Sequence, residues 1–246
     1  MDSKEITEGY STKKAQDIYS KIGLWPEEEK LFNKLFKKGS KILDIGCGGG
    51  RTSIPLAKKG NKVYAIDITP SMIKIAKNNA KKNKINIEFE TISLTEIDYP
   101  ENFFDNALFS FNGIEHISPD DIQKSLNNVS KSLKKGGYFV FTTHTFLYPG
   151  KGFKYWNIWI KKLFSFYLKK IFGVKNNEKY FGDLHWNDYG KDLYAHFAMP
   201  NYYINKLKKA GFSEITLIPK NKIIHNKKYS FFDNFKETFL FFICKK

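Results

Sequence analysis

The sequence predicts an α/β fold in which a mostly parallel sheet is flanked by helices, and three observations support this. From Gly39 onward, short β-branched apolar runs alternate with segments of helical periodicity. A glycine-rich turn directly follows the first of these runs. The 246 residues, 41% of them hydrophobic, are enough to bury a sizeable core and are unlike a disordered composition.

The alternation places the expected elements in order along the chain. Strands are expected at residues 41–45, 62–66, 86–90, 104–111 and 138–143, and two closing strands at 214–218 and 238–244. Helices are expected at residues 52–59, 69–82, 119–134 and 201–210. Pro70 suits the first turn of its helix, where its missing N–H has no intrahelical partner to lose. Gly136 and Gly137 are expected to close the helix at 119–134.

Two regions interrupt the alternation, and they divide what we expect to be a single domain over residues 1–246. Residues 1–40 are expected to form an N-terminal helical cap, with an apolar stripe at Leu31, Leu35 and Phe36. Residues 41–144 would be the ligand-binding core. Residues 145–200 would be a lid or acceptor insertion after the fifth strand, and residues 201–246 the C-terminal helix and closing strands.

The charge balance suggests an anionic partner, but its composition argues against one. The chain has 41 Lys and Arg against 25 Asp and Glu, a formal net charge of +16. Only one of the cations is an arginine, Arg51. Arginine is the preferred residue for phosphate and base recognition because its planar group donates hydrogen bonds in pairs. Dispersed, solvated lysines are therefore the favoured interpretation, and nucleic acid stays open as a less favoured partner.

The cysteine content and the lack of long apolar runs predict a protein of a reducing compartment. Cys47 and Cys244 lie almost a full chain apart, which excludes a disulfide framework or a zinc ribbon. The first ten residues lack the apolar stretch of a signal peptide, and no uncharged apolar run approaches the roughly 18 residues of a membrane span. We expect a cytoplasmic protein without a metal.

The most informative motif is the run from Asp44 to Gly50, DIGCGGG, between a strand and a helix. Its glycines let the backbone turn sharply and let a ligand approach without meeting a Cβ atom. A dinucleotide fingerprint would need glycine at Arg51, and the lysine of a phosphate-binding loop is missing. Asp44 would repel a pyrophosphate, so the loop favours a ligand that carries an amine.

With these residues the sequence resembles the class I S-adenosylmethionine-dependent methyltransferases, and its Glu115–His116 pair resembles their ubiquinone-biosynthesis-type branch. The family's first motif is matched by Asp44, Gly46, Gly48 and Gly50, and its second by Asp67 after the next strand. The resemblance continues through residues 102–105 and 133–138. It implies a Rossmann-like seven-stranded, mostly parallel sheet with an antiparallel last strand and a helical insertion after the fifth strand.

The resemblance also implies the cofactor, S-adenosyl-L-methionine, with S-adenosyl-L-homocysteine as product, and the residues that hold it. The Asp67 carboxylate would accept both ribose hydroxyls. Family members place an acid near position 93 for adenine, but this chain has Ser93, so Glu96 or Asp98 are alternatives. The expected cofactor-binding residues are Asp44, Gly46, Cys47, Gly48, Gly50, Asp67, Ile68, Ser93, Leu94, Phe111, Asn112 and Tyr19, with Tyr10 as an alternative to Tyr19.

Three residues are expected to act on the methyl acceptor: His144, Asn112 and His116. Asn112 would orient the acceptor, while His116 and its neighbour Glu115 suit either a structural or a proton-transfer role. His144 is the favoured base because ligands bind beyond the carboxyl ends of the strands. The alternatives His185 and His196 lie in the insertion.

The insertion contains an amphipathic, lysine-rich segment with three interpretations. Residues 154–174 have helical periodicity, and residues 151–180 hold eight lysines and one acid. The segment would be a lid helix, an interfacial helix in transient contact with anionic lipid, or an RNA-contacting face.

Three functions are open. The favoured one transfers a methyl group by in-line SN2 displacement to an oxygen or nitrogen of a small-molecule acceptor. The alternatives are a tRNA or rRNA methyltransferase and a non-catalytic cofactor-binding scaffold. Oligomeric state is not predicted.

Overall fold

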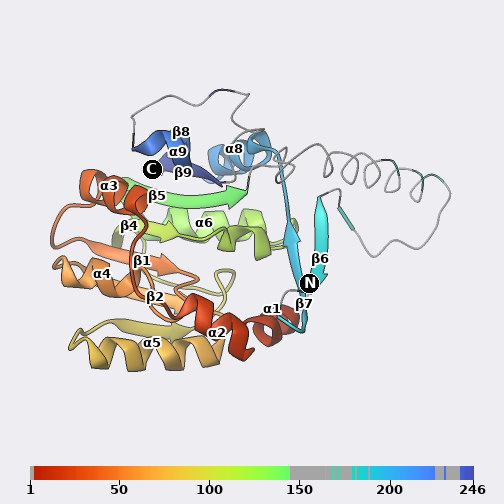
Figure 1. Ribbon diagram of the computed structural model, residues 1–246. Coiled ribbons are helices and arrows are strands. Elements are labelled where there is room, and N and C mark those ends of the chain that lie inside the picture. The colour runs from red at the N-terminus through yellow and green to blue at the C-terminus, as the bar shows by residue number, and fades with distance from the viewer. Residues whose placement is uncertain are drawn as a thin grey trace.

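The computed structural model describes residues 3–144, 179–180, 182–187, 189–224 and 239–246, together with Phe164, Leu168, Ile171 and Ser230. The expected amphipathic helix at 154–174 therefore lies outside the described residues, apart from those three apolar positions. The remaining segments form a central sheet, helices on both of its faces, and a separate two-stranded hairpin (Figure 1).

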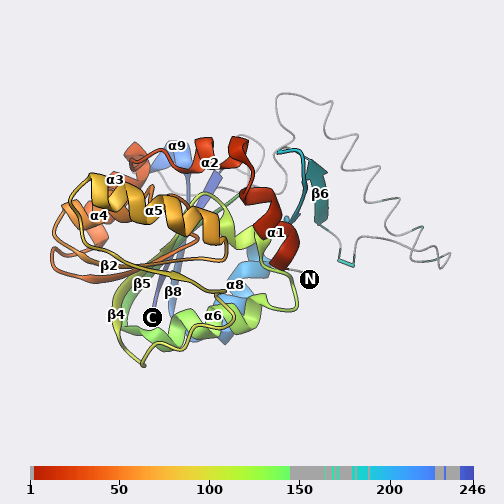
Figure 2. The same cartoon turned by 90° about the horizontal axis from the view of Figure 1, so that it is seen from below.

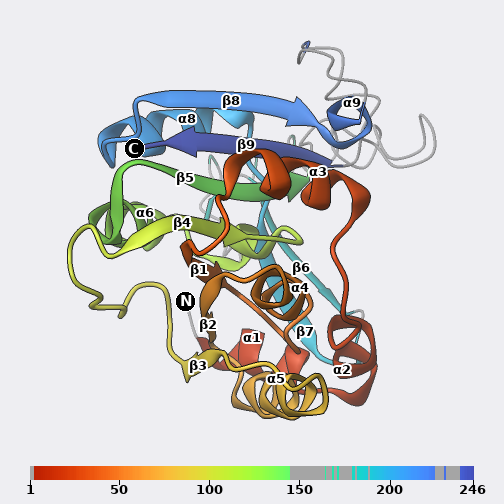
Figure 3. The same cartoon turned by 90° about the vertical axis from the view of Figure 1, so that its left-hand side faces the viewer.

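The central sheet has seven strands in the order β3-β2-β1-β4-β5-β9-β8, which Figure 3 shows from β8 at the top to β3 at the bottom. Neighbours from β3 to β5 are parallel, while β9 runs antiparallel to both β5 and β8. The strands are β1 (Lys41–Ile45), β2 (Lys62–Asp67), β3 (Glu88–Thr91), β4 (Phe104–Phe109), β5 (Leu133–His144), β8 (Glu214–Pro219) and β9 (Phe239–Lys245). The predicted Rossmann-like sheet with an antiparallel last strand is confirmed.

Helices cover the sheet on both faces (Figure 2). One face packs against α3 (Pro26–Leu35), α4 (Ser53–Lys58), α5 (Pro70–Lys82) and α9 (Lys220–Ile223), and the other against α6 (Ile122–Ser132) and α8 (Pro200–Lys209). Each helix buries one apolar side; in α6, Ile122, Leu126 and Val129 lie at helical spacing and are almost fully buried. This double cover explains why the central strands are apolar on both faces.

Several predicted boundaries differ from the structure, and the largest difference is at the start of the fifth strand. The helix expected at 119–134 ends at Ser132, and β5 begins at Leu133 instead of residue 138, because Leu133 already pairs with Phe104 of β4. The glycines expected to close the helix lie within the strand, where the register shifts. The strand expected at 104–111 ends at Phe109, because left-handed backbone at Phe111 and Asn112 cannot continue an extended strand.

The N-terminal residues are helical, as predicted, and form α1 (Ser3–Tyr10), α2 (Lys13–Tyr19) and α3. The insertion also contains a β-hairpin of β6 (Asp183–Asn187) and β7 (Asp192–His196), which the sequence analysis missed. Helix α1 packs against β7, where Ile6 and Leu193 are buried together (Figure 1). The cap and the hairpin therefore meet at the end of the sheet where β1 to β4 finish.

Candidate active site

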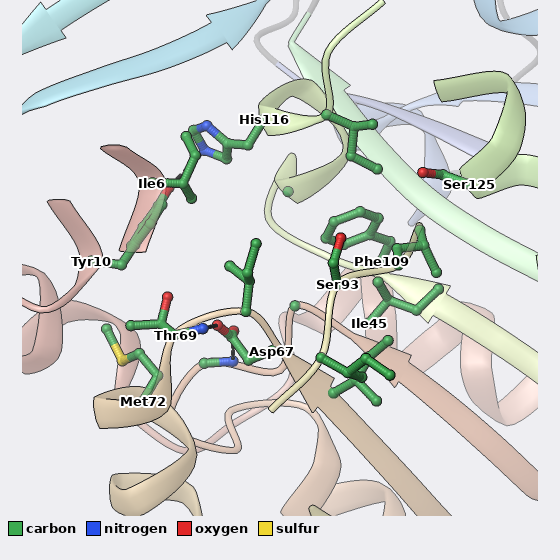
Figure 4. A pocket seen from close by; sticks show the side chains of 18 of the residues that line it. Ile6, Tyr10, Ile45, Asp67, Thr69, Met72, Ser93, Phe109, His116 and Ser125 are labelled. Atoms are coloured by element: carbon green, nitrogen blue, oxygen red, sulfur yellow. Dashed lines mark hydrogen bonds between the residues drawn. The ribbon is translucent and has the colours of Figure 1, made fainter. Parts of the chain in front are cut away.

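A cavity of about 540 Å3 lies at the carboxyl ends of the parallel strands. Its wall includes Ile45, Ile66, Thr91 and Phe109, each of which is the last or next-to-last residue of β1, β2, β3 or β4. Ligands of open parallel sheets bind at this edge, beside the point where the strand order reverses between β1 and β4. The volume lies within the range of small-molecule and cofactor pockets. Figure 4 shows the side chains converging on this space.

The glycine loop and Asp67 form one wall of the cavity. Gly46 and Gly48 have φ of 62° and 54°, values that side-chain-bearing residues rarely adopt. A Cβ atom on Gly46 would lie 2.6 Å from the ring of Phe109, so the loop is closed to larger residues. Asp67 accepts hydrogen bonds from the Gly48 N–H at 2.9 Å and the Thr69 N–H at 2.8 Å. Burial raises the pKa of this carboxyl group above its ordinary value.

Asp44 does not line the cavity but lies behind the glycine loop. Its Oδ2 atom accepts hydrogen bonds from the Thr52 hydroxyl at 2.6 Å and from the Ser53 hydroxyl at 2.5 Å. Its Oδ1 atom is buried without a partner. Burial raises the pKa of Asp44 to about 6, although the two hydroxyl groups act in the opposite direction. Cys47 and Gly50 likewise lie outside the cavity wall.

The end of the cavity beyond β3 is formed by Ile68 and by residues 91–96. Ser93 and Leu94 both line it, and the Ser93 hydroxyl is 2.8 Å from the hydroxyl of Thr95. Of the two acidic alternatives, Glu96 lines the cavity. Asp98 is 91% exposed and pairs with Lys131, so it is the weaker candidate for an adenine contact.

Aromatic residues of the N-terminal cap cover the cavity. Tyr10 and Tyr19 line it, and their rings pack edge to face with centroids 5.2 Å apart. The Tyr10 hydroxyl donates to His116 Nε2 at 2.7 Å, and His116 Nδ1 donates to the main-chain oxygen of Tyr194 at 2.6 Å. Through these two contacts His116 joins the cap to the hairpin. Burial lowers its pKa.

A strained turn follows β4 and separates the cavity from His144. Phe111 and Asn112 have φ of 55° and 60°, which is unfavourable for residues other than glycine and common at functional sites. The turn directs Phe111 to the cavity wall. It buries Asn112, whose Nδ2 atom lies 3.2 Å from Nε2 and 3.3 Å from Nδ1 of His144. The Asn112 Oδ1 atom is buried without a partner.

Beyond this turn, His144 at the end of β5 is paired with Glu115 of the 3-10 helix η1 (Gly113–His116). Its ring Nδ1 is 2.7 Å from Glu115 Oε2, and its main-chain N–H donates to Glu115 Oε1 at 2.6 Å. Phe239 and Phe197 pack beside the imidazole. The side chain of His144 is 37% exposed, whereas that of Glu115 is 3% exposed.

The other two candidate bases lie in the hairpin. His196 Nδ1 is 2.8 Å from Asp183 Oδ1, and the two side chains are only 7% and 4% exposed. His185 is 3.3 Å from Glu5 at the surface, away from the cavity wall. Neither position brings a histidine to the cavity.

The only arginine of the chain holds the cap against the glycine loop. Arg51 donates two hydrogen bonds to the fully buried Glu28 of α3, at 2.6 and 2.7 Å, and a third to the main-chain oxygen of Gly23. Its guanidinium group also lies over the ring of Trp25. Arg51 is therefore used for packing and is not presented to a nucleic acid.

Comparisons of the chain with known protein families and proteins agree with this geometry. Residues 42–137 match a family described as "Methyltransferase domain". The core of the chain is therefore similar in sequence to methyltransferase domains. The chain is 36% identical over 106 residues to a ubiquinone biosynthesis O-methyltransferase of Pelagibacter ubique and 34% identical over 106 residues to one of Coxiella burnetii. These matches span 43% of this chain and 42% and 44% of those relatives, less than half of their length.

The fold of the chain is also similar to that of solved structures. A structure from Methanosarcina mazei, described as one of the SAM-dependent methyltransferases, has a TM-score of 0.65 at 20% identity and covers 92% of this chain and 99% of its own. Among the described residues, no helix of the chain is long and apolar enough to cross a membrane. Within the same residues, no group of three His, Cys, Asp or Glu side chains is arranged as metal ligands.

The sequence analysis missed several residues that line or border the cavity. Thr69, Met72 and Ile6 line the cavity, and Tyr189 of the insertion lies 3.0 Å from the Tyr19 hydroxyl. The periodicity of α1 and α5 marks their buried faces but does not show which buried residues border a cavity. No sequence signal pairs Glu115 with His144, because 28 residues separate them and the contact depends on the turn after β4.

Proposed function

We propose that this protein is an S-adenosylmethionine-dependent methyltransferase that acts on a small-molecule acceptor. The observation that carries the proposal is the arrangement of the glycine loop and Asp67 at the carboxyl ends of β1 and β2. The relatives are named as O-methyltransferases, which supports an oxygen atom as the site of methylation over the nitrogen that the sequence leaves open.

The residues present fit the cofactor. The left-handed glycines leave a cradle without side chains. Each oxygen of Asp67 accepts one backbone N–H and keeps a further lone pair for a ribose hydroxyl. The unpartnered Oδ1 of Asp44 supplies negative charge behind the loop, which suits the ammonium group of a methionine moiety. Ser93, Leu94 and Glu96 would contact the adenine, and Tyr19 would cover the site.

Chemically, the bound cofactor supplies a methyl group on a positively charged sulfur, which is already a good leaving group. The protein must therefore align the acceptor oxygen with the methyl group and receive the proton that the oxygen loses. His144 is the base in this proposal, because it is partly exposed and contacts Asn112, whose neighbours Phe111 and Gly113 line the cavity. Asn112, between the cavity and His144, would orient the acceptor.

The experiment has two stages. Calorimetry with S-adenosylmethionine is expected to show binding; no binding would overturn the proposal. Transfer of a labelled methyl group is then measured with panels of hydroxyl-bearing compounds, amine-bearing compounds and tRNA. Incorporation into hydroxyl compounds is the expected result. Incorporation only into tRNA, with steep salt dependence, would replace the small-molecule acceptor by a nucleic acid, and binding without any transfer would favour the scaffold.

A further inference from the structure

Glu115 is a buried carboxylate whose two oxygens face a single residue. Oε1 accepts the main-chain N–H of His144, and Oε2 faces the ring Nδ1 of the same histidine. Its side chain is 3% exposed. A buried carboxylate is costly unless it is paired, so this arrangement couples the charge of Glu115 to the imidazole.

The contacts determine which ring nitrogen of His144 carries the proton. A carboxylate accepts hydrogen bonds, so at 2.7 Å from Glu115 the Nδ1 atom must be the donor. In the neutral imidazole the lone pair then lies on Nε2. The second contact, to the main chain of the same residue, holds the end of β5 in place relative to η1. Glu115 therefore constrains both the position of His144 and its tautomer.

The pair lies outside the cavity wall, next to the turn that follows β4. Phe111 lines the cavity, and the next residue, Asn112, contacts the imidazole of His144. The nearly equal distances from Asn112 Nδ2 to the two ring nitrogens place the amide group against the imidazole. The rings of Phe239 and Phe197 lie 5.1 and 5.2 Å from that of His144.

We propose that Glu115 is a positioning residue that holds His144 as the proton acceptor for a hydroxyl group on an apolar skeleton. This proposal rests on the proposed function. As the acceptor oxygen forms its bond to the methyl carbon, the carbon–sulfur bond breaks and its electron pair stays on the sulfur. The hydroxyl proton passes to Nε2 of His144, and the imidazolium is balanced by the Glu115 carboxylate until water takes the proton.

The same arrangement indicates the class of acceptor. A neutral hydroxyl has to lose a proton during or before attack, and a paired imidazole provides a place for it. Phe197 and Phe239 offer apolar surface beside the imidazole, and the Trp25 ring stacks on Phe239 with centroids 5.6 Å apart. His116 on η1 and Tyr203 on α8 interact electrostatically with the pair. The Nζ atom of Lys220 lies 4.1 Å from the centroid of the Trp25 ring and 5.3 Å from that of Phe239.

The test is nitrogen-15 NMR of the imidazole groups in the full-length, ligand-free protein. The wild type is expected to show His144 protonated on Nδ1. In Glu115→Gln the side-chain amide presents a donor to the imidazole, so the tautomer is expected to move to Nε2–H. Turnover is then expected to fall by about 10²-fold or more, while the Kd for S-adenosylmethionine by calorimetry stays unchanged.

An Nε2–H tautomer in the wild type overturns the proposal even if Glu115→Gln does not fold. Unchanged tautomer or unchanged turnover in a folded Glu115→Gln protein also overturns it. Because the NMR signature needs no ligand, failure of the proposed function is seen separately, as absent binding or absent transfer in the wild type. The matched control is Asp183→Asn, which alters the partner of His196 and is expected to leave the His144 tautomer unchanged.

Discussion

The molecule contains two histidine–carboxylate pairs that are chemically alike and differ in their surroundings. His144 and Glu115 join the end of β5 to η1, whereas His196 and Asp183 join the two strands of the hairpin. The first imidazole is 37% exposed and the second 7%. A base has to reach its substrate, so we propose proton transfer for the first pair only and expect a structural role for the second.

The partners of the two carboxylates support the same division. Glu115 faces only His144 in the contacts described above, while Asp183 accepts from His196, from the Tyr194 hydroxyl and from the main-chain N–H of Tyr180. Burial acts to raise the pKa of Asp183, but these donors outweigh it and hold that pKa below its ordinary value. A carboxylate held by three donors stabilises its hairpin and leaves little of its charge for an imidazolium.

The largest expected effect separates the two histidines. His144→Ala is expected to lower turnover by about 10²- to 10⁴-fold without changing the affinity for S-adenosylmethionine, because only the proton acceptor is lost. His196→Ala is expected to keep near-wild-type turnover below its own melting temperature. Initial rates with a labelled methyl donor and calorimetry measure both variants. Unchanged turnover in His144→Ala would remove this histidine from the mechanism.

The second effect concerns the free energy of unfolding, and we expect it at the hairpin pair of His196 and Asp183 instead of at His144 and Glu115. Asp183→Ala is expected to lower the free energy of unfolding by about 3 kcal/mol, because it leaves buried donors without their acceptor. Urea denaturation followed by circular dichroism measures this change. Asp98→Ala is the matched control, since Asp98 is 91% exposed and its ion pair with Lys131 contributes little. Equal stability of the two variants would contradict a structural role for the hairpin pair.

A third change distinguishes a binding defect from a proton-transfer defect. Asp67→Ala is expected to weaken S-adenosylmethionine binding by about 10- to 100-fold, because two hydrogen bonds from the ribose to a carboxylate are lost. Turnover at saturating cofactor is expected to fall far less than in His144→Ala. Calorimetric affinity equal to that of the wild type would refute the ribose assignment.

The smallest effect is a pH dependence at Asp44. The folded pKa of about 6 is above the ordinary value of 3.8, so the folded state binds this proton more tightly than the unfolded chain does. Stability should therefore fall as pH rises from about 4 to 6 and stay lower above that range, by an amount on the order of 2–3 kcal/mol.

Asp44→Asn is expected to remove this dependence of stability on pH and to weaken cofactor binding. Urea denaturation at pH 5 and pH 7.5 tests the first expectation, and a slope equal to that of the wild type would contradict it. A loss of slope together with weaker binding would identify Asp44 as a charge retained for the ligand at a cost in stability.

The sequence predicted the wall of the cavity that the glycine loop and Asp67 form better than it predicted the cover of the cavity, for a physical reason. The glycine loop and Asp67 each follow a strand directly, and adjacent parallel strands end at the same edge of a sheet. Their positions therefore follow from local sequence and connectivity. The pairing of Asp44 with Thr52 and Ser53 is also local, but its exclusion from the cavity wall depends on how α4 packs, which no motif indicates.

The cover of the cavity depends on contacts between segments that lie far apart in the sequence. Tyr10 meets His116 across 106 residues, and Tyr19 meets Tyr189 across 170. Periodicity showed that the N-terminal residues are helical but not which helix face covers the cavity. It also missed the hairpin that completes the cover, because five-residue strands flanked by polar residues give a weak signal.

Sequence alone determined the fold class, the glycine cradle, the acid after β2 and the identity of the candidate base, because each is encoded by residue types at short spacing. Only the tertiary structure decided that Arg51 is bound by Glu28, that His116 joins the cap to the hairpin, and that Glu115 faces His144. Those roles depend on burial and hydrogen-bond geometry between segments, and such long-range packing is not written in any one stretch of the chain.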